Sequence, residues 1–113
     1  MIHMNFDEYQ ALARRTQNPE LNDKDRLEHA LFGCMSELGE IAGIYQKAHQ
    51  GHKVYCGEVA KELGDLMWFI AELADCIEVN LDDVAEANIE KLKIRYPGGF
   101  TAKDSLERRD TRA

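Results

Sequence analysis

The sequence lacks the features that mark membrane, secreted and disulfide-rich proteins. No apolar run approaches the roughly 20 residues that a membrane-spanning helix needs. Asn5, Asp7 and Glu8 interrupt anything that resembles a signal peptide. Its three cysteines are odd in number and have no Cys-x-x-Cys spacing, which argues against a disulfide framework. We therefore expect a reduced, cytoplasmic protein with no membrane partner.

Positive charge is also scarce. There are 14 Lys and Arg residues against 21 Asp and Glu, so the formal net charge is −7. Such a chain is poorly suited to bind a nucleic-acid duplex or an anionic membrane as its main partner. An anionic substrate would need local cations, supplied by a bound metal and a few basic side chains.

Proline is nearly absent, with two residues in 113, while 44% of the residues are hydrophobic. This composition favours a compact helical protein, and the length predicts a single domain over residues 1–113. Apolar spacing, caps and breakers predict an all-α fold of about four helices, over residues 5–17, 24–49, 57–79 and 81–95.

Short polar and glycine-containing segments indicate where these helices begin and end. Asn5, Asp23 and Asn80 are candidate N-caps. Pro97 and the two glycines after it end the last helix. Residues 100–113 then form a C-terminal tail, which we expect to be anchored by Phe100 and Leu106 and frayed from Arg108 onward.

The second and third helices each carry an apolar stripe at alternating steps of four and three residues, which predicts that they pack as an antiparallel hairpin. The turn is expected in the segment His49 to Lys53, around Gly51. On the second helix the stripe is Leu27, Leu31, Cys34, Leu38, Ile41, Tyr45 and Ala48, and on the third it is Val59, Leu63, Leu66, Ile70, Leu73 and Ile77.

Acidic pairs lie on matching flanks of these two stripes. Glu37 and Asp65 are centred on Gly51, and so are Glu40 and Glu62, which makes the two pairs level across the hairpin. Four carboxylates gathered in this way repel one another and raise some of their pKa values unless a cation is present. Oxygen ligands suit Mg²⁺ or Mn²⁺. The alternative is a solvated acidic face, partly paired with lysines.

Several other residues have both a structural and a functional interpretation. Trp68 lies off the main stripe and is expected to pack rather than to stack on a base. We expect Gly33, Gly39 and Gly43 to allow close helix packing, with ligand access as the alternative. His49 and His52 are expected in a solvated loop rather than in a zinc site, because no third ligand follows at a convincing spacing.

Two groups of polar residues are candidate phosphate ligands. Asn88, Lys91 and Arg95 share one face of the fourth helix, either as a basic surface stripe or as a phosphate clamp. Lys47, near the hairpin turn, could also contact a phosphate.

The two acidic motifs resemble those of the MazG-like all-α nucleotide pyrophosphohydrolases. The motifs are Glu37-x-x-Glu40 and Glu62-x-x-Asp65, and Ser36 stands where many members carry another glutamate. The likeness extends to the segments Asn5–Gln10, Arg15-Thr16, Glu62–Trp68, Asn88–Lys93 and Arg95–Phe100.

That resemblance implies a helical bundle that is completed by dimerisation, in a homodimer or homotetramer. It implies hydrolysis of nucleoside or deoxynucleoside triphosphates between the α and β phosphates. Glu37, Glu40, Glu62 and Asp65 would hold Mg²⁺, for which Mn²⁺ could substitute, and Glu37 or Glu40 could instead act as the base. Family resemblance also favours the phosphate clamp formed by Asn88, Lys91 and Arg95.

Two other classes of protein remain as alternatives. One is a non-catalytic helical module that binds nucleotides or a protein as a regulator. The other is a di-iron carboxylate bundle, which is disfavoured because the histidines stand outside the Glu-x-x-His pattern of such sites.

Overall fold

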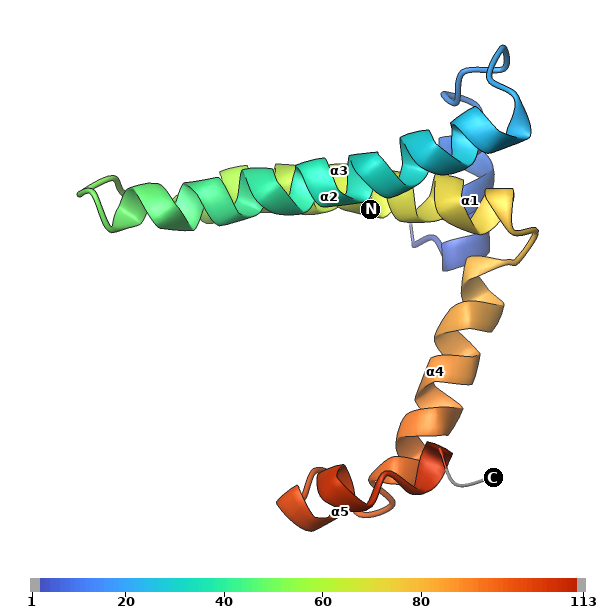
Figure 1. The fold of residues 1–113 in the computed structure, drawn as a ribbon, viewed down its shortest axis with the longest axis vertical. Helices are drawn as coiled ribbons and strands as arrows, with labels where there is room; N and C mark the ends of the chain where they lie inside the picture. The colour runs from blue at the N-terminus through green and yellow to red at the C-terminus, as the bar shows by residue number, and fades with distance from the viewer. Residues whose placement is uncertain (1–2, 112–113) are drawn as a thin grey trace. The chain divides into compact units, whose positions relative to one another are not determined.

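The structure is a computed structural model that describes residues 3–111. This range is all-helical and contains no strand, apart from one isolated bridge between Pro97 and Gly99, which confirms the predicted fold class. The elements are α1 (Phe6–Arg14), α2 (Asp23–Ala48), α3 (Cys56–Cys76), α4 (Leu81–Arg95), α5 (Ala102–Glu107) and the 3₁₀ helix η1 (Arg109–Thr111) (Figure 1).

The chain divides into two compact units, with the boundary between Asn80 and Leu81. The first unit holds α1 to α3 and the second holds the remaining helices. The single domain over residues 1–113 therefore stays a prediction. No helix within residues 3–111 combines the length and the apolar character needed to cross a bilayer.

The first unit is built on the hairpin of α2 and α3, which lie side by side and antiparallel (Figure 1). The turn is where the sequence predicts it. Gly51 has φ +94°, and the N–H of His52 reaches back to the carbonyl of Lys47 at 3.1 Å, as in a Schellman motif. The left-handed backbone at position 51 is the reason that a glycine ends α2 there.

The C-terminus of α3 differs from the prediction. The helix ends at Cys76 rather than near residue 79. Glu78 adopts a left-handed conformation with φ +58°, and the N–H of Val79 bonds to the carbonyl of Ala74 at 3.0 Å. This is a second Schellman motif, and it is hidden from sequence reasoning because glutamate seldom takes this conformation.

The N-caps are partly as predicted. Asn5 Oδ1 accepts a hydrogen bond from the N–H of Glu8 at 2.8 Å, which confirms the cap of α1. The cap of α2 is Asn22, whose Oδ1 accepts from the N–H of Asp25 at 2.8 Å, so the prediction of Asp23 is wrong by one residue. As the first helical residue, Asp23 still places its charge at the positive end of the helix dipole.

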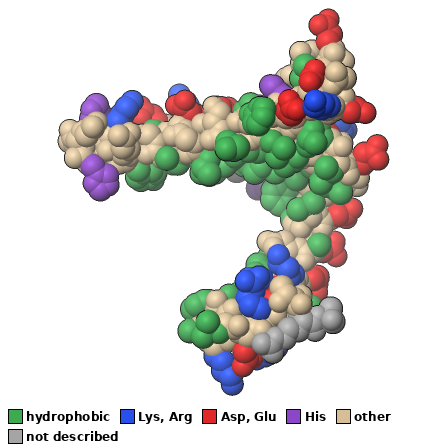
Figure 2. Space-filling view, viewed as in Figure 1, with side chains coloured by type: hydrophobic (Ala, Val, Ile, Leu, Met, Phe, Trp, Pro, Cys, Tyr) green, Lys and Arg blue, Asp and Glu red, His purple; other side chains and the backbone are tan. Residues whose placement is uncertain are grey.

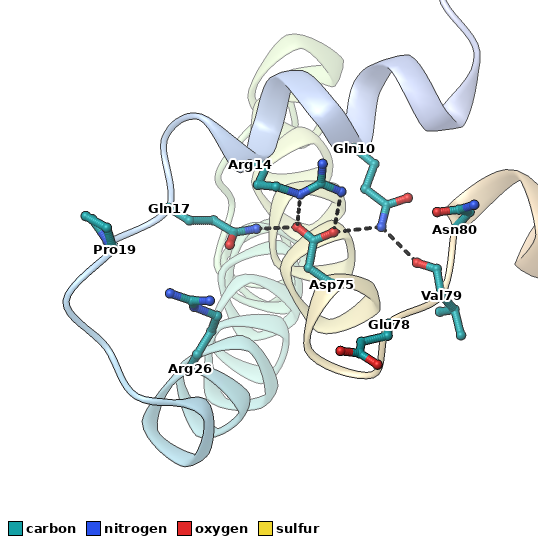
Figure 3. A pocket seen from close by; sticks show the side chains of 9 residues that line it. All are labelled: Gln10, Arg14, Gln17, Pro19, Arg26, Asp75, Glu78, Val79 and Asn80. Carbon is teal, nitrogen blue, oxygen red and sulfur yellow. Dashed lines mark hydrogen bonds and ion pairs between the residues drawn. The ribbon is translucent and has the colours of Figure 1, made fainter.

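One carboxylate fastens α1 to α3 (Figure 3). Asp75 accepts hydrogen bonds from Arg14 Nη2 at 2.7 Å, Gln10 Nε2 at 2.9 Å and Gln17 Nε2 at 2.7 Å. Burial of this carboxylate raises its pKa, but the bonds from Arg14, Gln10 and Gln17 outweigh burial and hold the pKa of Asp75 below its ordinary value of 3.8. The ionised form is therefore the one that joins the two helices.

The first unit buries little of its apolar surface. Among the described hydrophobic residues, only Ala13, Ala30, Ala71 and Ala74 are buried. Stripe residues such as Leu38 and Leu63 remain 59% and 50% exposed. Two helices touch along a narrow line, so a hairpin cannot cover stripes of this width. Hydrophobic side chains accordingly gather on the hairpin surface near its α1 end (Figure 2).

In the second unit, charge pairs order the tail. Arg95 bonds Asp110 through Nε at 2.7 Å and Nη2 at 2.6 Å, and Arg109 pairs with Asp104 at 2.9 Å. The prediction of fraying from Arg108 is therefore wrong as far as Thr111, while residues 112 and 113 lie outside the described residues.

Hydrophobic anchoring of the tail is also a wrong prediction within the described chain. Phe100 and Leu106 are 75% and 84% exposed. Ion pairs between residues 15 positions apart leave no periodic signal in the sequence, which is why the Arg95–Asp110 anchor was not foreseen.

Candidate metal centre

Three carboxylates converge across the hairpin. Glu62 and Asp65 are three residues apart on one face of α3, and Glu37 meets them from α2. One oxygen from each of the three lies within 4.8 Å of the others. Glu37 and Glu62 are partly buried, whereas Asp65 is exposed. This is the convergence that the shared centre at Gly51 predicts.

The three carboxylates change the pKa of one of their own members. A hydrogen bond with Glu62, burial, and the charges of Glu62, Asp65 and Glu40 raise the pKa of Glu37 from 4.5 to about 7. Glu37 Oε2 is buried and has no hydrogen-bond partner among the described residues. A bound divalent cation would favour the ionised form of Glu37, and an all-oxygen donor set of this size fits Mg²⁺ or Mn²⁺.

Glu40 does not join the three-residue group, contrary to the predicted set of four level carboxylates. It is exposed, one helical turn beyond Glu37, and acts on Glu37 only through its charge. The physical reason is repulsion: without a cation, a fourth carboxylate is more stable in water than in a cluster that already holds three.

A cavity of about 450 Å³ lies beside the carboxylates and is lined by Thr16, Glu37, Asp65, Trp68 and Phe69. From α1, Tyr9 also approaches the site. Burial raises the pKa of the Tyr9 phenol, and the charge of Asp65 raises it further. No role for Tyr9 or Thr16 was predicted, because only long-range docking brings α1 to this place. The one sequence signal was that both belong to segments of the family resemblance.

Close packing occurs at one of the three glycines of α2. A Cβ built at Gly33 would lie 2.1 Å from Cδ1 of Phe69, so the Phe69 ring rests where only glycine leaves room. No atom of another described part of the chain lies within 4 Å of a Cβ built at Gly39 or Gly43. The prediction of close packing is thus confirmed at Gly33 and not met inside the described chain at Gly39 and Gly43.

Of the four predicted phosphate ligands, Lys47 is in the first unit and the other three are in the second. Lys47 is exposed and ten residues beyond Glu37, which is about 15 Å along the axis of α2. Asn88 and Lys91 are exposed on α4, in the second unit. Arg95 already forms its bidentate ion pair with Asp110.

The described residues offer no second candidate metal site beside the carboxylates. Within residues 3–111, Glu37, Glu62 and Asp65 form the single group of His, Cys, Asp and Glu side chains that is close enough to hold an ion. His49 and His52 are exposed at the hairpin turn, as the solvated-loop interpretation expects.

Comparison with known proteins agrees with this geometry. The model of the MazG nucleotide pyrophosphohydrolase domain matches residues 26–100, which include all three carboxylates. The Gene 37 protein of Mycobacterium phage L5 is 32% identical over 105 residues, covering 85% of this chain and 92% of the phage protein. No solved structure matches significantly. Together with the helical hairpin and its carboxylate group, the match shows that the chain belongs to the MazG nucleotide pyrophosphohydrolase family.

Proposed function

We propose that this protein hydrolyses nucleoside or deoxynucleoside triphosphates between the α and β phosphates, giving a nucleoside monophosphate and pyrophosphate, in a reaction that depends on Mg²⁺. Family membership supports nucleotide pyrophosphohydrolase chemistry. The observation that supports the metal dependence is the convergence of Glu37, Glu62 and Asp65, together with a buried Glu37 Oε2 that has no hydrogen-bond partner among the described residues.

Each carboxylate has a role that its surroundings favour. Glu37, Glu62 and Asp65 would hold the ion, with Glu37 in its ionised form. When bound, Mg²⁺ would neutralise phosphate charge and lower the pKa of the attacking water. Glu40 is exposed one turn away and lies outside the three-residue group, and in this proposal it would orient that water or accept its proton.

Polar and basic side chains elsewhere in the chain are candidates to bind the phosphates of the substrate. The amide of Asn88 and the ammonium group of Lys91 are exposed and can donate hydrogen bonds to phosphate oxygens. We leave Arg95 out of the clamp, because its guanidinium is committed to Asp110. Lys47 would contact a phosphate only in an arrangement that brings the turn of one hairpin to another site, as a homodimer or homotetramer could do.

The test is pyrophosphate release from a panel of NTPs and dNTPs with Mg²⁺, with Mn²⁺ and with EDTA. We expect monophosphate and pyrophosphate in equal amounts, no turnover in EDTA, and no turnover for Asp65→Asn. Glu86→Gln on the exposed face of α4 is the matched control and should keep full activity. Nucleotide binding without turnover by folded wild-type protein would favour the non-catalytic regulatory module instead.

A further inference from the structure

The cavity beside the carboxylates has an aromatic wall that metal binding does not explain. Trp68 and Phe69 line it, and their ring centroids are 5.1 Å apart in an edge-to-face arrangement. Trp68 lies three residues after Asp65, so both side chains project from about the same side of α3, one turn apart. The indole is thus a near neighbour of the candidate metal centre.

Hydrogen bonds hold the indole in one orientation. Trp68 Nε1 donates to Thr16 Oγ1 at 2.7 Å, and that hydroxyl donates to the carbonyl oxygen of Ala13 at 2.8 Å. Because the single hydroxyl proton is used on Ala13, Thr16 can only accept from the indole. The end of α1 therefore positions the Trp68 ring.

The ring next to it is held equally firmly. Phe69 rests against the backbone of α2 at Gly33, where a Cβ would collide with it. The imidazole of His29 packs against Phe69 with centroids 5.4 Å apart, and His29 Nδ1 is 2.6 Å from Oε1 of the buried Glu72. The wall is therefore preorganised rather than adaptable, which lowers the cost of ordering a ligand.

An aromatic wall beside a carboxylate group matches the two ends of a nucleotide. The carboxylate end, with a bound metal, would take phosphate, and the indole of Trp68 would offer a face on which a heterocycle can stack. The cavity volume of about 450 Å³ is within the usual range of roughly 300–1,000 Å³ for small-molecule sites. Stacking tolerates every base, because each base has a π-face.

We propose that Trp68 is the nucleobase-stacking residue of this site, and that Thr16 is a positioning residue that fixes the indole for stacking. The proposal rests on the proposed function, since it assigns the base end of the same substrate. It departs from the expectation that Trp68 serves packing alone. It implies that base selectivity is modest and that larger purine rings gain more from the wall than pyrimidines.

Trp68 is the sole tryptophan of the chain, so its fluorescence reports on this wall directly. The probes are α,β-methylene-ATP and α,β-methylene-dUTP with Mg²⁺, and inorganic triphosphate as the probe without a base. We expect both nucleotides to quench Trp68 saturably and triphosphate to bind, by calorimetry, with little quenching. Nucleotide binding without quenching, or equal quenching by triphosphate, would overturn the stacking role alone. Failure of all three probes to bind would overturn the proposed function with it.

Variants separate stacking from general packing. Trp68→Leu should raise KM for nucleotides roughly ten-fold, with kcat for pyrophosphate release nearly unchanged, and Trp68→Phe should restore most of the loss. Tyr55→Leu, an exposed aromatic at the start of α3, is the control and should leave KM unchanged. An unchanged KM for Trp68→Leu would refute the proposal.

Thr16 is tested separately, which also covers the case that Trp68→Leu fails to fold. Thr16→Val removes the acceptor of the indole N–H, so it should raise KM and shift the tryptophan emission. Thr16→Ser keeps the hydroxyl and should behave as wild type. Equal KM values and equal emission for the two variants would overturn the positioning role.

Discussion

At the scale of single residues, Glu37 is the group whose charge state decides most. Its unfolded-state pKa of 4.5 rises to about 7 in the fold, principally through its hydrogen bond with Glu62. Between these values the folded protein binds more protons than the unfolded chain, so the free energy of unfolding falls as pH rises through that window. Mg²⁺ bound at Glu37 would favour the ionised form and should cancel this loss.

Removing the ionisable group at position 37 should remove this pH dependence of stability. Glu37→Gln cannot ionise, so without metal it should be more stable than the wild type at pH 8 and nearly equal to it at pH 4.5. It should also lose the stabilisation that Mg²⁺ gives the wild-type protein at pH 8. Urea unfolding at the two pH values, with and without about 5 mM Mg²⁺, measures the pH dependence of stability and the stabilisation by Mg²⁺.

The control for this prediction is Glu86→Gln on α4, an exposed carboxylate outside the group. It should follow the wild-type pH and Mg²⁺ dependence. Glu37→Gln with an unaltered response to Mg²⁺ would contradict the ligand role of Glu37.

Asp75 shows how one residue can join two elements. Its carboxylate receives Arg14, Gln10 and Gln17, so Asp75→Ala leaves three polar side chains without their shared acceptor. We predict a loss of about 2–3 kcal/mol in the free energy of unfolding at pH 7. Because the folded pKa is lowered, the stabilising contribution is present above pH 3.8 and disappears as pH falls through the folded pKa.

Denaturant unfolding of Asp75→Ala and of the control Glu86→Ala, at pH 7 and at pH 3, checks this prediction. The control removes an exposed carboxylate and should change stability by less than about 0.5 kcal/mol. A gap between Asp75→Ala and the wild type that does not narrow toward pH 3 would argue that the ionised network is not what stabilises the docking of α1.

At the scale of elements, the hairpin depends on a close approach of α3 to α2 at Gly33. A methyl group there would lie 2.1 Å from Cδ1 of Phe69, so the ring must move. Gly33→Ala gains up to about 1 kcal/mol of helix propensity. Overpacking typically costs about 1–3 kcal/mol, so we predict a net loss of stability by chemical denaturation.

Gly39→Ala in the same helix is the matched comparison, because nothing else within residues 3–111 lies within 4 Å of a Cβ built there. It should stabilise the protein by up to about 1 kcal/mol. The double variant Gly33→Ala/Phe69→Leu replaces the ring by a smaller side chain, so it should recover part of the stability that Gly33→Ala loses. Equal effects of the two glycine substitutions would show that the Phe69 contact is not what requires Gly33.

At the scale of the whole molecule, the chain leaves too much apolar surface uncovered for a typical monomer. On α2, Phe32 and Met35 are 62% and 71% exposed, and in the second unit Leu106 is 84% exposed. We therefore predict a homodimer or homotetramer at micromolar concentration, measured by light scattering after size-exclusion chromatography. A monomeric mass for the wild type would contradict this prediction.

A charged face should weaken that assembly. Phe32→Glu/Met35→Glu adds two charges on one side of α2 and should shift the mass toward the monomer. The control is Ala87→Glu, which adds a charge on the exposed face of α4 and leaves the candidate phosphate ligand Lys91 in place. It should leave the mass unchanged.

Short-range information in the sequence determined the helices, the hairpin and the three-carboxylate group. Apolar spacing set the stripes, Gly51 marked the turn, and the acidic pairs centred on it predicted the meeting of Glu37 with Asp65 and Glu62. These features depend on helical periodicity and on one turn, which a linear pattern records.

Tertiary structure alone decided the rest, because it depends on contacts between distant segments. Docking of α1 through Asp75 brings Tyr9 and Thr16 to the carboxylates, and no local pattern encodes that approach. Glu40 is solvent-exposed outside the group, because the charges of the three gathered carboxylates repel it. Arg95, a predicted phosphate ligand, instead pairs with Asp110 and fixes the C-terminal tail against α4. Sequence thus determined which side chains share a helix face, and packing decided which of them meet.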